Sequence, residues 1–584
     1  MRCCDCRQVW VFHSGAALLL VASTAVAGES SVRFSDVAVA AGASFENRYD
    51  RPFPDAVIPR VAGGVGAGDY DGDGWVDLYG VRANAGTNLL LHNRGDGTFE
   101  DLAETAGVSL AGEAVQGPTF ADYDGDGALD LFIGSTNATF PRLFRNVGTR
   151  AFELIPDAVP AVAGAPYNSA TFGDVDRDGD LDLLTTHWGY LFFQGGIDHL
   201  WRNDGGGRFT GITEESGLTI KVEQNGSLFI QWSFCGNFAD ITNDGIPDLL
   251  LSQDYGRSQV FVGNGDGSFR ETTTGVISDE NGMGSAIGDY DNDGDLDWFV
   301  SSIYLAGVPS NPDFGTSGNR LYRNRGDGSF EDATDEAGVR DGNWGWGSCF
   351  ADFDNDGFLD LFHVNGWDLD SRFVAQGARL FMSNRDGTFT EQAESAGVAD
   401  RGDGRGVVCF DYDRDGDVDI FVANNGGSSR LFRNESDDGA AFLHVRLIGR
   451  PPNTEGIGAR IQVTSAGTTQ IRELRAGCNY VSQDPAEAHF GLASATNVDE
   501  LRVRWPDGFE TARRDVAVNQ FLQIARDPGD ANCDGSLSAA DFVRSLSSNG
   551  QPPQPYRCPL ADLDEDGVVN DEDRLALVHI VFQG

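Results

Sequence analysis

Short apolar stretches alternate with loops rich in Gly, Asp and Asn along most of the chain, which predicts many short strands. In each unit an apolar or Gly-rich strand precedes an aspartate-rich loop, and a second apolar strand, such as 129–133, follows it. A third strand ends in an Arg-Asn turn, as at 321–324, and a Gly-Asp-Gly hairpin leads to a fourth strand that begins at a Phe, as at Phe330. The pattern therefore predicts units of four strands.

The aspartate-rich loop recurs seven times. Its first aspartates are Asp69, Asp122, Asp174, Asp240, Asp289, Asp352 and Asp411, spaced 49 to 66 residues apart. Strand-rich units at this period are typical of a propeller. We therefore expect a mainly β fold in which residues 28–440 form a seven-bladed β-propeller.

The two ends of the repeat region indicate how such a ring would close. A signature for the outermost strand, F-x-D-φ-A-x-x-A-G with φ apolar, occurs at 99–107 and recurs with variation at Phe330 and Phe389. It also occurs at 34–42, before any aspartate loop, whereas the seventh unit lacks it after Asn434. The N-terminal strand is thus predicted to complete the last blade, which removes the free edges of an open ring.

The spacing D-x-D-x-D-G-x-x-D indicates calcium sites. It places side-chain oxygens at positions 1, 3, 5 and 9, a backbone carbonyl at position 7 (Trp75 in the first loop) and a Gly at the sharp turn. Hard oxygen ligands in a flexible loop suit Ca²⁺ better than Mg²⁺, and unneutralised carboxylates so close together would repel. The expected ligands are Asp69, Asp71, Asp73 and Asp77; Asp122, Asp124, Asp126 and Asp130; Asp174, Asp176, Asp178 and Asp182; Asp240, Thr242, Asp244 and Asp248; Asp289, Asp291, Asp293 and Asp297; Asp352, Asp354, Asp356 and Asp360; and Asp411, Asp413, Asp415 and Asp419. The fourth loop departs at Thr242 and Pro247, which predicts a weak or empty site.

The N-terminus and the overall charge predict a secreted protein. Arg2 and Arg7 precede an apolar run at 15–26 and a small-x-small site at 25–27, which together predict a signal peptide over 1–27 and no membrane span. The 584 residues carry a formal net charge of −48, which argues against binding to nucleic acid or to an anionic membrane. Cys235, Cys349, Cys409 and Cys478 lie in apolar contexts and are expected to be buried thiols, whereas Cys533 and Cys558 could pair in an oxidising compartment.

Two resemblances extend this interpretation. The repeats resemble the FG-GAP (VCBS) repeats of integrin-like propellers. Residues 441–527 resemble the ASPIC/UnbV module of the cartilage acidic protein family, at 456–460, 489–492 and 502–508. From the residues alone this module is only a small β-rich domain with a Pro-Asp-Gly turn. The resemblance implies calcium-dependent extracellular interaction and supplies no reaction.

Residues 528–584 resemble a type I dockerin, a small α-helical, EF-hand-like module. Two twelve-residue loops end in Asp where ordinary EF-hands have Glu, and an apolar helix-like stretch follows each loop. The resemblance implies Ca²⁺ ligands at Asp530, Asn532, Asp534, Asp541, Asp562, Asp564, Asp566 and Asp573. The tail could tether the protein to a cohesin-like receptor, or could serve only as a stabilising cap.

An aromatic face is the candidate ligand surface. The Asp loops and the Gly-Asp-Gly hairpins should share one face of the ring, so the remaining turns lie on the opposite face. The residues expected there are Trp188, Trp232, Trp344, Trp346, Trp367, His187, His363, Tyr190 and Tyr304. These rings could form a platform for an extracellular protein or a glycan, or could pack between blades.

The sequence has no G-x-S-x-G, HExxH or P-loop motif. Arg-Gly-Asp triplets begin at Arg94, Arg325 and Arg401, and the first two belong to the repeat's hairpin turns. We therefore expect no catalytic residues and a non-enzymatic, calcium-binding adhesion platform. The alternative is a carbohydrate-active enzyme or an accessory subunit of a polysaccharide-degrading complex.

Overall fold

The computed structural model describes residues 32–526 except 49–57, 84–85, 137–139, 149, 161–165, 189–197, 219–221, 225–226, 230–231, 309–314, 369 and 437–438, and only the backbone at 58–59 and at the remaining residues of 222–229. The expected signal peptide (1–27), the dockerin-like tail (528–584), Cys533, Cys558 and Tyr190 therefore lie outside the described residues.

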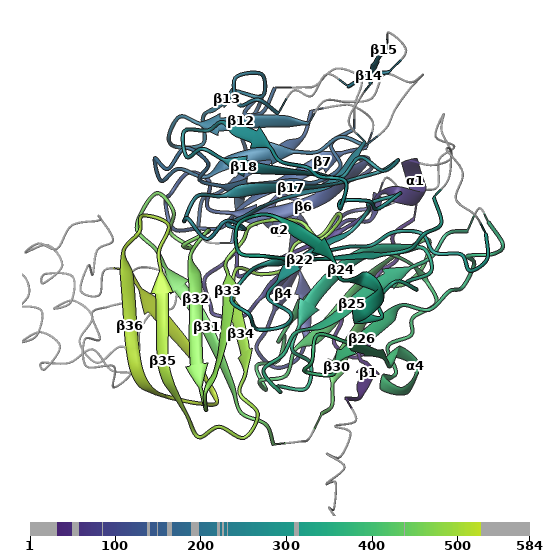
Figure 1. Cartoon of the computed structure of the whole chain (residues 1–584). Coiled ribbons are helices and arrows are strands. Elements are labelled where there is room, and N and C mark those ends of the chain that lie inside the picture. The colour runs from purple at the N-terminus through teal and green to yellow at the C-terminus, as the bar shows by residue number, and fades with distance from the viewer. Residues whose placement is uncertain are drawn as a thin grey trace, which may run out of the picture. The chain divides into compact units, whose positions relative to one another are not determined.

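Seven sheets of four antiparallel strands occupy residues 34–434 (Figure 1). They are β2 (Val65–Gly68), β3 (Asp77–Gly80), β4 (Leu89–Asn93) and β5 (Phe99–Asp101); β6 (Val115–Ala121), β7 (Asp130–Ser135), β8 (Arg142–Asn146) and β9 (Phe152–Leu154); β10 (Ala170–Gly173), β11 (Asp182–Thr185), β12 (His199–Asn203) and β13 (Phe209–Gly211); β16 (Ser233–Ala239), β17 (Asp248–Gln253), β18 (Gln259–Gly263) and β19 (Phe269–Glu271); β20 (Ser285–Gly288), β21 (Asp297–Val300), β22 (Arg320–Asn324) and β23 (Phe330–Asp332); β24 (Gly345–Ala351), β25 (Asp360–Asn365), β26 (Arg379–Ser383) and β27 (Phe389–Glu391); and β28 (Asp403–Phe410), β29 (Asp419–Asn425), β30 (Arg430–Asn434) and β1 (Phe34–Asp36). A separate hairpin pairs β14 (Val222–Gln224) with β15 (Ser227–Phe229).

The order of contacts between sheets is circular. The first strand of each sheet contacts the first strand of the next, from β2 through β6, β10, β16, β20, β24 and β28, and β28 contacts β2 again. These strands are almost wholly buried, since Gly, Ala and small polar residues let the backbones of neighbouring sheets approach. The arrangement is consistent with an FG-GAP propeller.

The N-terminal strand completes the last sheet, as the sequence predicted. β1 pairs antiparallel with β30, with Phe34 opposite Asn434 and Asp36 opposite Phe432, and Figure 1 labels β1, in purple, beside green β30. The same signature forms one-turn helices elsewhere: α2 (Ala103–Ala106), α3 (Thr334–Ala337) and α4 (Ala393–Ala396) each end at a Gly in the left-handed conformation. The remaining helical turn is α1 (Ile58–Val61).

Residues 442–525 form a β-rich module with its own core. One sheet contains β34 (Ala488–Gly491), β31 (Phe442–Ile448) and β37 (Gln520–Ala525); the other contains β33 (Thr468–Glu473), β32 (Arg460–Ser465), β35 (Asn497–Arg504) and β36 (Glu510–Ala517). Alternate residues of β31, β32 and β35 point inward and pack around Trp505. This agrees with the small β-rich domain expected here.

A segment of this module, residues 474–485 between β33 and β34, runs along the first strands of the seven-sheet region; we call it the insert loop. Backbone hydrogen bonds join Phe172 N to Ala476 O (2.8 Å), Ser285 N to Asn479 O (3.0 Å) and Ala67 N to Gln483 O (3.1 Å). Further contacts reach β6, β16 and β28. Tyr480 packs on Trp346 of β24, with ring centroids 5.2 Å apart. The insert loop therefore touches the first strand of each of the seven sheets.

Candidate metal centres and interaction surfaces

The seven Asp loops share one hydrogen-bonding scheme. In the first loop the Asp69 carboxylate accepts from the backbone N–H of Gly74 (2.8 Å), and Gly74 has a φ of 95° that favours glycine. The Asp77 carboxylate accepts from Asn93 N (2.7 Å) in the third strand and from Tyr70 N (3.2 Å). Position 9 thus fixes its loop to the body of its sheet.

Carboxylates that the sequence singled out lie close together in several loops. Ligand oxygens of three acids lie within 4.8 Å of one another in several loops: Asp69, Asp71 and Asp73; Asp122, Asp124 and Asp130; Asp174, Asp176 and Asp182; and Asp289, Asp291 and Asp297. Burial, together with the neighbouring carboxylates of each loop, raises the pKa of Asp69 and of Asp174 to about 7 and that of Asp182 to about 8. Unneutralised, these clusters are therefore unfavourable.

Several of these oxygens are buried without a hydrogen-bond partner among the described residues. They include Oδ1 of Asp174, Oδ1 of Asp291 and Oδ1 of Asp413. A buried polar atom without a partner is costly, and a carboxylate oxygen can be satisfied by a cation. The acids that lie together occupy positions 1, 3 and 5 or positions 1, 3 and 9 of their loops, and such hard oxygen donors suit a calcium ion.

The fourth loop is different, because two arginines of the module contact its first aspartate. Arg504 Nη2 contacts Asp240 Oδ2, and Arg460 Nη2 donates to the Asp240 carbonyl at 2.6 Å. Thr242 Oγ1, at position 3, has no hydrogen-bond partner in the described part of the chain. Cationic side chains thus neutralise the carboxylate of the loop in which the sequence departs from the repeat.

Other loops also contact the module through their first aspartates. Arg446 Nη1 lies 3.0 Å from Asp69 Oδ2, Thr454 Oγ1 donates to Asp122 Oδ2, and His444 Nε2 lies 3.5 Å from Asp411 Oδ2. Sequence reasoning missed these contacts, because nothing local in the module indicates which surface its arginines face.

A recurring asparagine links neighbouring sheets and was also missed. The Asn of the Arg-Asn turn donates from Nδ2 to the backbone carbonyl at position 2 of the preceding loop: Asn146 to Tyr70 (2.7 Å), Asn203 to Tyr123 (2.7 Å) and Asn434 to Phe353 (2.8 Å). The recurrence of the Asn in the repeat was the available signal. Sequence analysis interpreted it only as a turn.

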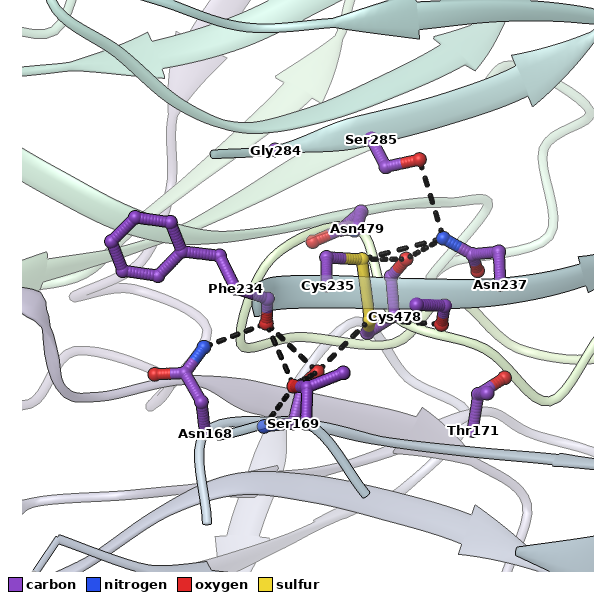
Figure 2. Close-up of a disulfide and its surroundings, with 12 residues drawn as sticks. Asn168, Ser169, Thr171, Phe234, Cys235, Asn237, Gly284, Ser285, Cys478 and Asn479 are labelled. Carbon is purple, nitrogen blue, oxygen red and sulfur yellow. Dashed lines mark hydrogen bonds between the residues drawn. A yellow bond between two sulfur atoms is a disulfide. The ribbon is translucent and has the colours of Figure 1, made fainter. Parts of the chain in front are cut away.

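The expectation that four cysteines are free thiols is wrong. Cys235 of β16 and Cys478 of the insert loop form a disulfide, and Cys349 of β24 is bonded to Cys409 of β28. Figure 2 shows the first disulfide, with the Asn237 side chain directed toward it and Nδ2 donating to the Cys478 carbonyl (2.8 Å). The first bond joins a strand of the repeat region to the insert loop of the module, and the second joins strands of two different sheets. The apolar residues around each cysteine in the sequence gave no indication of either bond.

The candidate aromatic face divides into a buried part and a partly exposed part. Trp344, Trp346 and Trp367 are 7%, 2% and 8% exposed, and their rings stack on one another at centroid distances of 4.7 to 6.4 Å. His187 and His363 are fully buried. These side chains belong to the core.

Trp188 and Trp232 remain partly exposed. Trp232 packs edge-on against both Trp188 (5.7 Å) and Tyr255 (5.3 Å), and 46% of Tyr255 is accessible to solvent. Trp188 Nε1 donates to Asp254 Oδ2 at 3.1 Å. We call Trp188, Trp232, Asp254 and Tyr255 the aromatic edge. Two of its residues, Trp188 and Trp232, were expected on the ligand face.

Comparison with known proteins assigns the repeats and the module. The FG-GAP-like repeat matches at 69–133, 122–185, 240–300 and 304–363, and the ASPIC and UnbV domain matches at 449–531. The chain therefore contains FG-GAP repeats followed by an ASPIC/UnbV domain. It is homologous to cartilage acidic protein 1: the human protein is 23% identical over 552 residues, which cover 85% of this chain and 78% of the relative. The Xenopus tropicalis protein is 23% identical, with 85% and 80% covered.

Two solved structures align with the chain at low structural similarity. An Agrocybe aegerita lectin that recognises non-reducing terminal N-acetylglucosamine aligns with a TM-score of 0.38 and 17% identity, covering 63% of this chain and 86% of that one. The Bacillus licheniformis rhamnogalacturonan lyase PL11 aligns with a TM-score of 0.35 and 14% identity, covering 63% and 71%. Among the described residues, no helix is long and apolar enough to cross a membrane.

Proposed function

We propose that this protein is a secreted, calcium-loaded, seven-bladed propeller that acts as an extracellular binding platform without enzymatic activity. The observation that carries the proposal is the repeated cluster of buried carboxylates with unpartnered oxygens in the Asp loops. Secretion is supported by the signal-peptide pattern and by two disulfides, which persist in oxidising compartments. The dockerin-like tail would be a tether, with its own calcium ions, for a cohesin-like receptor.

Calcium removal tests the proposal. A ligand that binds only the folded state at a hundredfold excess over its Kd stabilises by about 2.7 kcal/mol per site. Several sites together should make the melting temperature fall by on the order of 10 °C when EDTA replaces Ca²⁺ at neutral pH. Magnesium added back at equal concentration is the control and should restore little. An unchanged melting curve, with metal content confirmed at zero, would contradict the proposal.

The binding surface that the geometry favours is the aromatic edge. Two partly exposed tryptophan rings and an exposed tyrosine ring beside a carboxylate can stack on a sugar ring or hold a protein loop, and polar groups fix the orientation. Trp232→Ala should weaken binding to extracellular glycan arrays or to captured partners without changing the melting temperature. Exposed Phe140, which lies outside the edge, offers the control variant Phe140→Ala. If neither variant loses binding, the aromatic edge is not the binding surface.

A further inference from the structure

A cavity of about 170 Å³ lies between the module and the later sheets of the repeat region. Its acidic lining residues are Asp352, Asp411, Glu473, Asp484 and Glu487, and its basic ones are Arg472 and Arg475. His444 and His489 of the module also line the cavity, and neither histidine belongs to the Asp loops described above.

The two histidines are opposite one another in an antiparallel pair. His444 of β31 pairs with His489 of β34, and their ring centroids are 4.7 Å apart. Only 6% of His444 is exposed, yet neither of its ring nitrogens has a hydrogen-bond partner in the described residues. Phe521 stacks on the ring at 4.6 Å and fixes its plane. A buried imidazole with both nitrogens unsatisfied is unfavourable and requires an explanation.

The second histidine is oriented as metal ligands are. Nε2 of His489 lies 3.3 Å from the carbonyl oxygen of Gly416, which can only accept, so the proton is on Nε2. Nδ1 then carries the lone pair, and it is buried without a hydrogen-bond partner in the part of the chain that the structure describes. Histidines that bind metals usually donate their other N–H to a carbonyl or carboxylate in this way.

A carboxylate lies beside the first histidine. His444 Nε2 lies 3.5 Å from Asp411 Oδ2. In a tetrahedral site with metal–ligand bonds of about 2.1 Å, neighbouring ligand atoms are about 3.4 Å apart. We propose that His444, His489 and Asp411 bind one divalent transition-metal ion of the zinc type. Imidazole ligands favour such an ion over calcium, which prefers an all-oxygen site.

This ion would join the module to the seventh Asp loop through one shared carboxylate. Asp411 Oδ2 faces His444, whereas Oδ1 is buried without a partner among the described residues and remains available to a calcium ion in its own loop. The site therefore uses one residue of the proposed calcium centres. The experiment is done with calcium-saturated protein so that the two metals are measured separately.

The test uses the full chain, with Co²⁺ as a spectroscopic probe and Zn²⁺ as the competitor. We expect one Co²⁺ per chain with the visible absorption of a low-coordinate, imidazole-containing site, displaced by Zn²⁺, and a Kd in the micromolar range or tighter. His489→Asn should weaken binding at least about 100-fold with unchanged calcium content. His92→Asn is the matched control, because His92 lies 3.3 Å from Asp71 and 3.1 Å from Asp77 in the first loop.

The control variant should bind Co²⁺ like the wild type. Absence of Co²⁺ binding, binding that survives His489→Asn, or loss in His92→Asn alone would overturn the proposal. X-ray absorption of the wild-type zinc form gives an answer that does not depend on a variant folding. Two imidazole ligands are expected, and none or one would overturn the assignment. The calcium content of the wild type reports on the proposed calcium function independently.

Discussion

Individual aspartates in equivalent positions have different environments. Asp289 has the acids of its own loop as neighbours, and burial raises its pKa to about 7. Asp240 instead contacts Arg504 and Arg460, which neutralise it without a metal. The repeat therefore provides unequal sites, although its sequence is nearly regular.

This difference leads to a prediction about calcium content. Asp289→Asn should remove one Ca²⁺ per chain, because it deletes a carboxylate ligand of the cluster with Asp291 and Asp297. Asp240→Asn should remove none. Elemental analysis after gel filtration in calcium-free buffer measures both, and equal losses in the two variants would show that the arginines do not replace the metal.

The buried tryptophans lead to a second prediction at this scale. Trp367 stacks on Trp344 at 4.7 Å and is 8% exposed, so Trp367→Ala should lower the free energy of unfolding by about 3–5 kcal/mol. Urea denaturation measures the loss. Trp232→Ala, in the partly exposed edge, should cost much less, and a neutral Trp367→Ala would instead indicate a surface role.

At the scale of elements, the patterns that depend on neighbouring residues could be predicted. The Asp loops, the four-strand units and the exchange of β1 follow from spacing and repetition. The disulfide of Cys235 and the contacts of Arg504 could not be predicted, since their partners lie more than 240 residues away in sequence. The polar insert loop likewise has its hydrogen-bond partners on other sheets.

Deletion of β1 tests the contribution of its pairing with β30 in the last sheet. A chain without residues 28–36 leaves the outer edge of β30 unpaired, which should lower the melting temperature and promote association. Light scattering and differential scanning calorimetry measure the two effects. Ser35→Ala keeps the backbone pairing with Arg433 and should behave like the wild type. If the truncated chain also behaves like the wild type, β1 contributes nothing to stability or to solubility.

In the whole molecule, the insert loop and its disulfide join the module to the FG-GAP repeats. The Cys235–Cys478 bond closes a segment of 243 residues, whereas Cys349–Cys409 closes one of 60. Loop-closure entropy predicts that the first bond stabilises more, by about 1 kcal/mol, within a usual range of about 2–5 kcal/mol.

Paired substitutions to serine check this prediction. Cys235→Ser with Cys478→Ser should lower the free energy of unfolding more than Cys349→Ser with Cys409→Ser does. The serine pairs avoid a lone reactive thiol, and equilibrium denaturation under identical calcium concentrations compares them. The reverse order would mean that native-state contacts, rather than chain entropy, determine the effect.

The pairing of β1 with β30 also has a consequence for the synthesis of the chain. Ser35 of β1 bonds to Glu435, 400 residues later. At about 5–20 residues per second, a ribosome needs roughly 20–80 s to cover that distance. Throughout that interval the first strand has no partner, and the last sheet cannot form. The N-terminal segment must therefore stay soluble and unpaired until residue 434 of the 584 has been synthesised.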